Sequence, residues 1–196
     1  MKNILLINGH EVYPPQAKGT LNQTIFSRIT ERLEDTYSIQ TTVIQDGYDV
    51  SEEQKKFEWA DAVIFQTPIY WFSIPGSFKT YIDQVYQYGV FFTGSDEYGQ
   101  GGLFTEKKYM LSLTWNSPNE AFLDENSFFE GKNVDEALFH FHKTQAYVGM
   151  KPLKTFSLHD VISNPAIDQY LQALDHHLEE VFSIKIAGND SVDAAK

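Results

Sequence analysis

Short apolar runs alternate with amphipathic segments along the whole chain. Five of these runs predict strands: Asn3–Asn8, Ser38–Ile44, Ala62–Gln66, Tyr109–Thr114 and Leu153–Leu158. The third run is apolar up to its last position, which is typical of a strand buried on both faces of a sheet. Strands that alternate with amphipathic helices favour a parallel sheet covered by helices on both sides.

The segments between these runs repeat apolar residues every three or four positions, which is the spacing of one helix face. In the clearest case five residues share one side of the last predicted helix: Ile167, Leu171, Leu174, Leu178 and Val181. The earlier helices are expected at residues 21–33, 51–59, 76–88 and 134–148. Thr20 or Asn22 is expected to cap the first of them. Residues 89–102 and 122–132 show neither the helical spacing nor the apolar run of a strand, and they are expected to be irregular.

This alternation predicts an α/β fold, the flavodoxin-like three-layer sandwich. Its five-stranded parallel sheet would have the order 2-1-3-4-5, with helices on both faces. Residues 1–183 are expected to form this single domain, and residues 184–196 a disordered tail without an apolar period. Such a sheet binds its ligand beyond the carboxyl ends of its first, third and fourth strands. The loops after these strands are therefore the candidate site.

The composition narrows the classes of function. The 196 residues carry a net charge of −12, which argues against binding to nucleic acid or to an anionic membrane. The absence of cysteine excludes disulfides, iron–sulfur clusters and thiolate chemistry. No apolar run reaches the length of a membrane span or a signal-peptide core, so a cytoplasmic protein is expected. Aromatic residues make up 15% of the chain, so part of this ring surface is expected at a ligand site or subunit interface.

The first of the three loops leads into the helix after the first strand. Its residues 17–24, AKGTLNQT, offer backbone N–H groups, hydroxyls and the Lys18 cation where the helix begins. A helix start of this kind favours an anion. The glycine spacing of a Walker A loop or a dinucleotide fingerprint is missing. The loop therefore indicates a phosphate site, with an ordinary capped helix as the alternative.

The second loop carries three adjacent aromatic residues, Tyr70, Trp71 and Phe72, between two prolines. Proline fixes the backbone direction, so this loop is stiff and aromatic where most loops are polar. The third loop, Thr114–Ser117, offers an indole, an amide and two hydroxyls, which suit the face and the polar edge of a heterocycle. A phosphate at the first loop and a flat ring at the other two describe a flavin nucleotide. Aromatic residues that merely cap the core are the alternative.

The chain resembles the flavodoxin-like NAD(P)H:quinone oxidoreductases over roughly Met1 to Phe182, and among them the bacterial branch called modulator of drug activity B. The most specific part of the match is KKYMLSLTWN, residues 107–116. The rest of it comprises Asn3–Gly9, Leu21, Asn22, Thr24, Trp59–Asp61, Pro68, Trp71, Lys79, Tyr81–Asp83, Phe141–Lys143, Gly149 and Met150.

The resemblance implies a bound FAD, a homodimer, and two-electron reduction of quinones by NADPH or NADH. It implies that the cofactor is bound by Ala17, Lys18, Gly19, Thr20, Leu21, Asn22, Gln23, Thr24, Ile69, Tyr70, Trp71, Phe72, Thr114, Trp115, Asn116 and Ser117, and by the partner's Tyr98. The missing dinucleotide fingerprint fits a ping-pong cycle, in which donor and acceptor use one pocket in turn. Flat acceptors related to quinones are expected as well.

One feature of the larger animal enzymes of this family is missing here. Those enzymes have a tyrosine and a histidine after the fourth strand that are credited with steadying charge during hydride transfer. Trp115-Asn116-Ser117-Pro118 stands in that place in this chain. The proton donor is therefore left open between water and Tyr98, and Tyr98, Trp115 and Asn116 are the catalytic candidates.

Three other functions stay open from the sequence. The first is an FMN-dependent azoreductase or flavin reductase with the same fold. The second is a flavodoxin-like one-electron carrier, whose acidic surface would dock on a basic partner. The third is a binding module without flavin.

The histidines do not predict a metal site. His140 and His142 are two residues apart on a predicted helix and so face different sides of it. His10 is expected on the surface, in the turn after the first strand, with a functional role near the phosphate as the alternative. The adjacent His176 and His177 are expected in solvent on the last helix.

Overall fold

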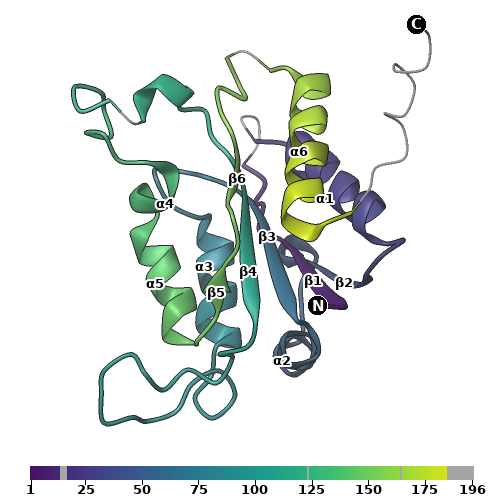
Figure 1. The fold of residues 1–196 in the computed structure, drawn as a ribbon, viewed down its shortest axis with the longest axis vertical. Coiled ribbons are helices and arrows are strands. Elements are labelled where there is room, and N and C mark those ends of the chain that lie inside the picture. Colours follow the sequence, from purple (N-terminus) through teal and green to yellow (C-terminus); the bar gives the residue numbers. More distant parts are fainter. Residues whose placement is uncertain (14–16, 123, 164, 185–196) are drawn as a thin grey trace, which may run out of the picture.

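The computed structural model describes residues 1–13, 17–122, 124–163 and 165–184. Within these ranges six parallel strands form one sheet in the order β2-β1-β3-β4-β5, and β6 also pairs with β4 (Figure 1). The strands are β1 (Asn3–Asn8), β2 (Ser38–Val43), β3 (Ala62–Pro68), β4 (Lys108–Thr114), β5 (Lys151–Pro152) and β6 (Phe156–Leu158). The predicted α/β fold and its strand order are confirmed.

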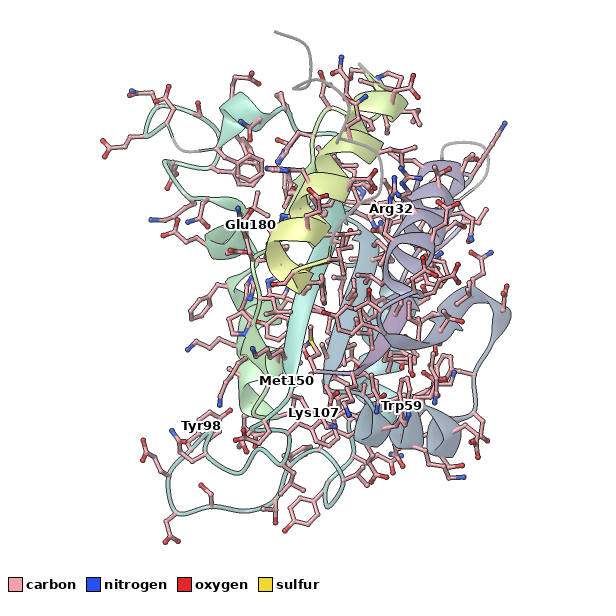
Figure 2. The ribbon with its side chains drawn as sticks, turned by 45° about the vertical axis from the view of Figure 1, so that its right-hand side comes forward. Arg32, Trp59, Tyr98, Lys107, Met150 and Glu180 are labelled. Atoms are coloured by element: carbon pink, nitrogen blue, oxygen red, sulfur yellow. The ribbon has the colours of Figure 1, made fainter. Side chains whose placement is uncertain are left out.

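Helices cover both faces of the sheet (Figure 1). One face carries α1 (Thr20–Leu33) and α6 (Ile167–Phe182), and the other carries α2 (Val50–Trp59), α3 (Gly76–Val85) and α5 (Phe139–Tyr147). The short elements are α4 (Val134–Ala137) and the 3-10 turns η1 (Ile44–Asp46) and η2 (Asn119–Ala121). The central strands begin at the edge that carries Trp59 and Lys107, at the bottom of Figure 2, and end at the opposite edge.

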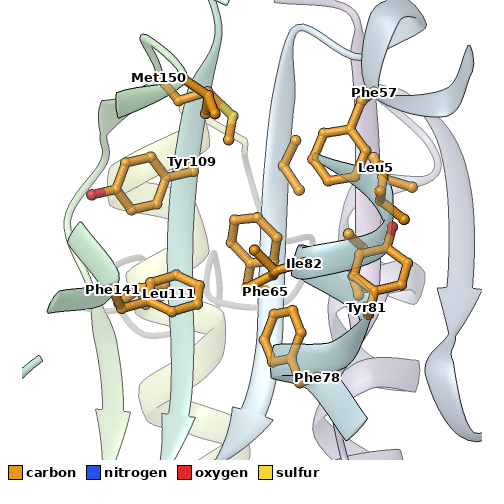
Figure 3. Packing of buried hydrophobic residues seen from close by; sticks show 14 of the residues in the cluster. Leu5, Phe57, Phe65, Phe78, Tyr81, Ile82, Tyr109, Leu111, Phe141 and Met150 are labelled. Carbon is orange, nitrogen blue, oxygen red and sulfur yellow. The ribbon is translucent and has the colours of Figure 1, made fainter. Parts of the chain in front are cut away.

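Side chains alternate between the two faces along each strand, so the sheet separates two apolar cores. Phe65 lies at the centre of the core toward α2, α3 and α5 (Figure 3). The rings in contact with it are those of Phe57, Phe78, Tyr109 and Phe141. The core toward α1 and α6 is mainly aliphatic, with Ile64 and Met110 wholly buried in it.

Two of the predicted elements differ in the structure. Of the expected fifth strand, 153–158, only β6 forms a strand, and β5 lies just before this range. Between β5 and β6 the Lys154 carbonyl and the Thr155 hydroxyl bond to helix side chains. Their partners are His177 of α6 at 3.0 Å and Asp135 of α4 at 2.6 Å. His177 is therefore buried, and the prediction that it is solvated was wrong. The expected helix at 134–148 breaks at Leu138, whose φ of −104° and ψ of 25° are not helical.

The predicted tail begins one residue too early. Ile184 is the only residue of 184–196 that the structure describes, and its side chain is buried beside α6. The remainder of the predicted tail lies outside the described residues. None of the helices in the described ranges combines the length and the apolar character needed to cross a membrane.

Candidate functional site

The carboxyl ends of β1, β3 and β4 bring the three loops to one edge of the sheet, which we call the carboxyl rim. The backbone N–H of Ile69 donates to the Thr114 carbonyl at 3.0 Å and joins the second loop to the third. The Tyr70 hydroxyl donates to the Glu11 carbonyl at 3.0 Å and joins the second loop to the first. Burial raises the pKa of Tyr70 to about 12, so this hydroxyl stays protonated and able to donate. The second loop is therefore joined at the carboxyl rim to the third loop and to the start of the first, at Glu11.

The first turn of α1 presents backbone N–H groups at the carboxyl rim. Gly19 holds the N-cap position with φ 77° and provides no side-chain cap, so the prediction of a cap at Thr20 or Asn22 was wrong. The first turn contains no acidic residue, and Lys18 before it is exposed. Uncapped amides, the helix dipole and an adjacent cation together favour an anion at this point.

The start of α3, which follows the second loop, already has an anion. The Glu11 carboxylate accepts a hydrogen bond of 2.9 Å from the backbone N–H of Ser77. This bond holds the pKa of Glu11 below its usual value. Because Glu11 neutralises the start of α3, the start of α1 is the one of these two that is open to a ligand.

His10 lies against Gly19 and is buried, so the prediction of a surface position was wrong. A Cβ atom at Gly19 would lie 2.4 Å from Cε1 of the His10 ring, which no side chain at position 19 can accommodate without movement. Burial lowers the pKa of His10, although the negative charge of Glu11 opposes this shift. The imidazole is therefore neutral near pH 7, and Lys18 supplies the positive charge of the first loop.

The second loop contains a two-residue turn with a strained backbone. Tyr70 and Ser73 exchange backbone hydrogen bonds of 2.8 and 3.1 Å, and Trp71 and Phe72 between them have φ of 48° and 64°. This left-handed region costs a non-glycine residue about 1–2 kcal/mol. The turn leaves the N–H groups of Trp71 and Phe72 outside the Tyr70–Ser73 pair and holds the Trp71 ring 93% exposed. Strain of this kind concentrates at ligand sites.

Trp71→Gly is expected to raise the free energy of unfolding of the ligand-free protein by about 1 kcal/mol. Glycine relieves the left-handed strain, and the exposed indole contributes almost no buried surface that could be lost. Urea unfolding measures the change. Ser183→Gly is the matched control, because Ser183 is exposed, has φ 54° and ends α6, and it should give a similar gain. A loss of stability in Trp71→Gly alone would contradict the strained turn.

The third loop is fixed by the segment that follows β6. The Asn116 side chain accepts a hydrogen bond of 3.2 Å from the backbone N–H of Ile162. The Ser117 carbonyl lies 3.2 Å from Nδ1 of His159. Burial lowers the pKa of His159, so its neutral ring can donate to this carbonyl. The oxygen of the Asn116 side chain and the carbonyl of Ser117 are therefore engaged within the protein.

The indole of Trp115 lies beneath the carboxyl rim and is only 2% exposed. It packs edge-on against Phe122 and Phe129 and parallel to His159. Its buried Nε1–H has no hydrogen-bond partner in the part of the chain that the structure describes. A buried donor without a partner is costly, so this N–H lowers the stability of the fold.

Sequence reasoning missed an aromatic wall between η2 and α4. Phe122 and Phe129 stack with their centroids 4.1 Å apart, and Phe128 stacks on Phe72 of the second loop at 5.3 Å. Phe128 is 71% exposed and Phe72 is half exposed, so the wall presents ring faces to solvent. The available signal was the adjacent pair Phe128-Phe129 within an otherwise polar, irregular segment.

Tyr98 lies at the edge of the sheet opposite the carboxyl rim, in the loop that precedes β4 (Figure 2). Its ring is 92% exposed and tilts against that of Tyr147 with the centroids 5.8 Å apart. Within one chain Tyr98 therefore does not approach the three loops. Any role of Tyr98 at such a site requires a second copy of the chain.

Two surface hollows flank these features. A groove of about 990 Å³ runs along α1, from Thr20 and Gln23 at the carboxyl rim to Arg28 and Glu31. A second hollow, of about 410 Å³, lies between α3 and α5, and Tyr98 is one of the residues that line it. Among the residues that the structure describes, no three or more His, Asp or Glu side chains are grouped as a metal site would require.

Comparison with known proteins identifies the family. A family model described as the flavodoxin-like fold matches residues 2–178. NADPH:quinone oxidoreductase MdaB from Haemophilus influenzae is 42% identical over 191 residues, which cover 92% of this chain and 99% of that protein. The chain belongs to the flavodoxin-like family that includes MdaB. The resemblance to the flavodoxin-like quinone oxidoreductases is thus confirmed.

Solved structures of flavodoxin-like proteins share the fold. NAD(P)H:quinone oxidoreductase from Methanothermobacter marburgensis has a TM-score of 0.68 at 16% identity, covering 89% of this chain and 96% of its own. General stress protein 14 from Treponema denticola, in complex with FMN, has a TM-score of 0.69 at 22% identity, covering 94% of this chain and 100% of its own. Similarity at this level shows the fold alone.

Proposed function

We propose that this protein is an FAD-dependent NAD(P)H:quinone oxidoreductase. It would transfer hydride from NADPH or NADH to quinones and related flat acceptors. The observation that carries the proposal is the uncapped, cation-flanked start of α1 at the same rim as the strained aromatic turn, Tyr70–Ser73. One rim thus offers a phosphate site beside a site for a flat ring. The 42% identity to MdaB over nearly the full length of both chains supports the activity.

The groups at the carboxyl rim fit a flavin nucleotide part by part. The first-turn amides of α1 and Lys18 would hold its phosphates. The N–H groups of Trp71 and Phe72, together with Thr114–Ser117, would hold its ring. When bound, the flavin supplies two-electron redox chemistry, taking hydride from the donor and passing it to the acceptor in a ping-pong cycle. The protein supplies binding, orientation and exclusion of water.

We propose that the enzyme is a cytoplasmic homodimer in which the partner's Tyr98 completes the site. The exposed rings of Tyr88 and Tyr98 support a surface that a second copy covers. The proton would then come from water or from the partner's Tyr98. Trp115 and Asn116 would act by position, Asn116 through its bond to Ile162. Light scattering on the purified protein tests the dimer, and a monomer at micromolar concentration would contradict it.

An FMN-dependent azoreductase or flavin reductase is the second candidate function. FMN is the ligand of the Treponema denticola neighbour, and the start of α1 would bind one phosphate as readily as two. A one-electron carrier suits the net charge of −12. The carrier is less favoured, because a minimal electron carrier does not need the exposed, stacked rings of Phe72 and Phe128.

The decisive experiment identifies the bound chromophore. The purified protein is expected to be yellow, and heat should release a flavin that runs with FAD and not with FMN. The same preparation should oxidise NADPH when a soluble quinone is added. Released FMN together with reduction of azo dyes would favour the second candidate, and a colourless protein that binds neither flavin would refute both.

A charge reversal locates the flavin at the first loop. Lys18→Glu is expected to weaken FAD binding about tenfold, since it places a negative charge beside the phosphates. Lys151→Glu makes the same change at the opposite edge of the sheet and should leave binding unchanged. Equal affinities in the two variants would place the flavin elsewhere.

A further inference from the structure

On the sheet face toward α1 and α6, the side chains change from apolar to polar near the carboxyl rim. The face is apolar at Ile64 and Met110, which lie side by side on β3 and β4. Two residues further along each strand, on the same face, the neighbours are Gln66 and Ser112. Both side chains are wholly buried. Buried polar groups cost free energy unless each finds a partner, so this pair calls for an explanation.

The Gln66 amide is the centre of a polar network that ends in α1. Its Nε2 donates to Oδ1 of Asn22 at 2.8 Å, and its Oε1 accepts from the Ser112 hydroxyl at 2.6 Å. The Thr114 hydroxyl lies 3.5 Å from the same oxygen of Asn22. Asn22 belongs to the first turn of α1 and is itself buried. The network therefore runs from β4 through β3 to the start of α1 beneath the rim.

Such a network fixes an orientation that apolar packing leaves loose. Below its first turn α1 is held on the sheet by Ile25, Ile29 and Leu33, whose contacts are not directional. Hydrogen bonds weaken steeply when their angle changes, and a network in which each member is paired specifies one arrangement. The bond between Gln66 and Asn22 therefore sets the direction of the first-turn N–H groups relative to β3 and β4, which carry the other two loops.

We propose that Gln66 is a positioning residue for the phosphate end of the cofactor. By holding Asn22, it aligns the first turn of α1 with the second and third loops, so that one molecule can bind by its phosphate and its ring at once. The inference rests on the proposed flavin function and adds a residue to it. Gln66 lies beneath the rim and acts through Asn22.

Gln66→Met tests this role, because methionine keeps the size of the side chain and removes both hydrogen bonds. The ligand-free variant is titrated with FAD, FMN and riboflavin by flavin fluorescence. Affinity for FAD and FMN should fall about 10- to 100-fold, the equivalent of one hydrogen bond to a charged group. Riboflavin, which has no phosphate, should bind as it does to the wild type.

Gln145→Met is the matched control. Gln145 is also wholly buried and accepts a hydrogen bond of 2.9 Å from the Tyr86 hydroxyl, but it lies in α5 on the other face of the sheet. It should change the affinity for none of the three flavins. Selective loss of the phosphorylated flavins in Gln66→Met alone would therefore not be a general effect of removing a buried amide.

Two outcomes would overturn the inference: equal losses for riboflavin and FMN in Gln66→Met, or no loss for either. If Gln66→Met does not fold, Asn22→Ala replaces it, since it removes the oxygen that accepts the hydrogen bond from Gln66. A loss with the same selectivity supports the inference, and unselective or absent loss overturns it. A wild-type protein that binds no flavin would refute the proposed function, and this inference with it.

Discussion

Gly19→Ala is expected to weaken the binding of FAD and FMN about 100-fold. The added Cβ would lie 2.4 Å from the His10 ring, and the backbone has φ 77°, which strains any residue but glycine. His10 is buried, so the first turn of α1 must shift to relieve the contact. Its N–H groups then lose their alignment on the phosphates, and the loss of one hydrogen bond to a charged group corresponds to about this factor. Titration of the ligand-free protein with each flavin measures the effect.

Gly47→Ala separates the steric contact from the strain of the backbone. Gly47 also has a positive φ, 88°, but a Cβ there would meet nothing within 4 Å. With ψ at 162°, its backbone is one that residues other than glycine rarely adopt, so the variant should cost about 1–3 kcal/mol of stability and leave flavin affinity unchanged. In the double variant of Gly19→Ala with His10→Ala the ring is gone, and much of the affinity should return. Binding as tight as that of the wild type in Gly19→Ala would show that the phosphate does not lie at the start of α1.

Phe65→Ala is expected to lower the free energy of unfolding by about 3–5 kcal/mol, because it leaves a cavity in the core toward α3 and α5. Phe65 is wholly buried, with four rings whose centroids lie 5.5–6.5 Å from its own (Figure 3). For a chain of this length the melting temperature should fall by about 6–20 °C. Urea unfolding gives the free energy and a thermal scan the temperature.

Phe139→Ala makes the same substitution on the surface of α5, where the ring is 62% exposed. Its expected cost is below about 1 kcal/mol. Both variants are measured without flavin, so that binding does not contribute to their stability. A cost as small in Phe65→Ala as in Phe139→Ala would contradict the view that this ring cluster attaches the helices to the sheet.

The carboxyl rim holds several features that cost stability in the absence of a ligand. Trp71 and Phe72 are strained, the indole N–H of Trp115 is unpaired among the described residues, and the first turn of α1 is uncapped. Away from this rim, the sheet face toward α1 and α6 is packed with apolar side chains. A ligand that pairs the amides of this first turn offsets part of the cost, and by mass action its binding would add to the stability of the fold.

The order of apolar and polar residues was enough to predict the architecture. The period of two along a strand and of 3.6 along a helix is local, so β1, β3, β4 and α6 could be placed within about two residues of their observed ends. Because parallel strands all end at one edge, the sequence also predicted that residues 17–24, 69–72 and 114–117 would meet.

Only the tertiary structure decided what each side chain at that edge does. Trp115 is buried beneath the rim, His10 is pressed against Gly19, and Phe128 of an irregular segment stacks on Phe72. The non-strand segment between β5 and β6 depends likewise on partners distant in the sequence. Local periodicity reports which face of an element a residue occupies. Whether a ring on that face meets solvent, a ligand or another ring is set by segments that the chain brings there only on folding.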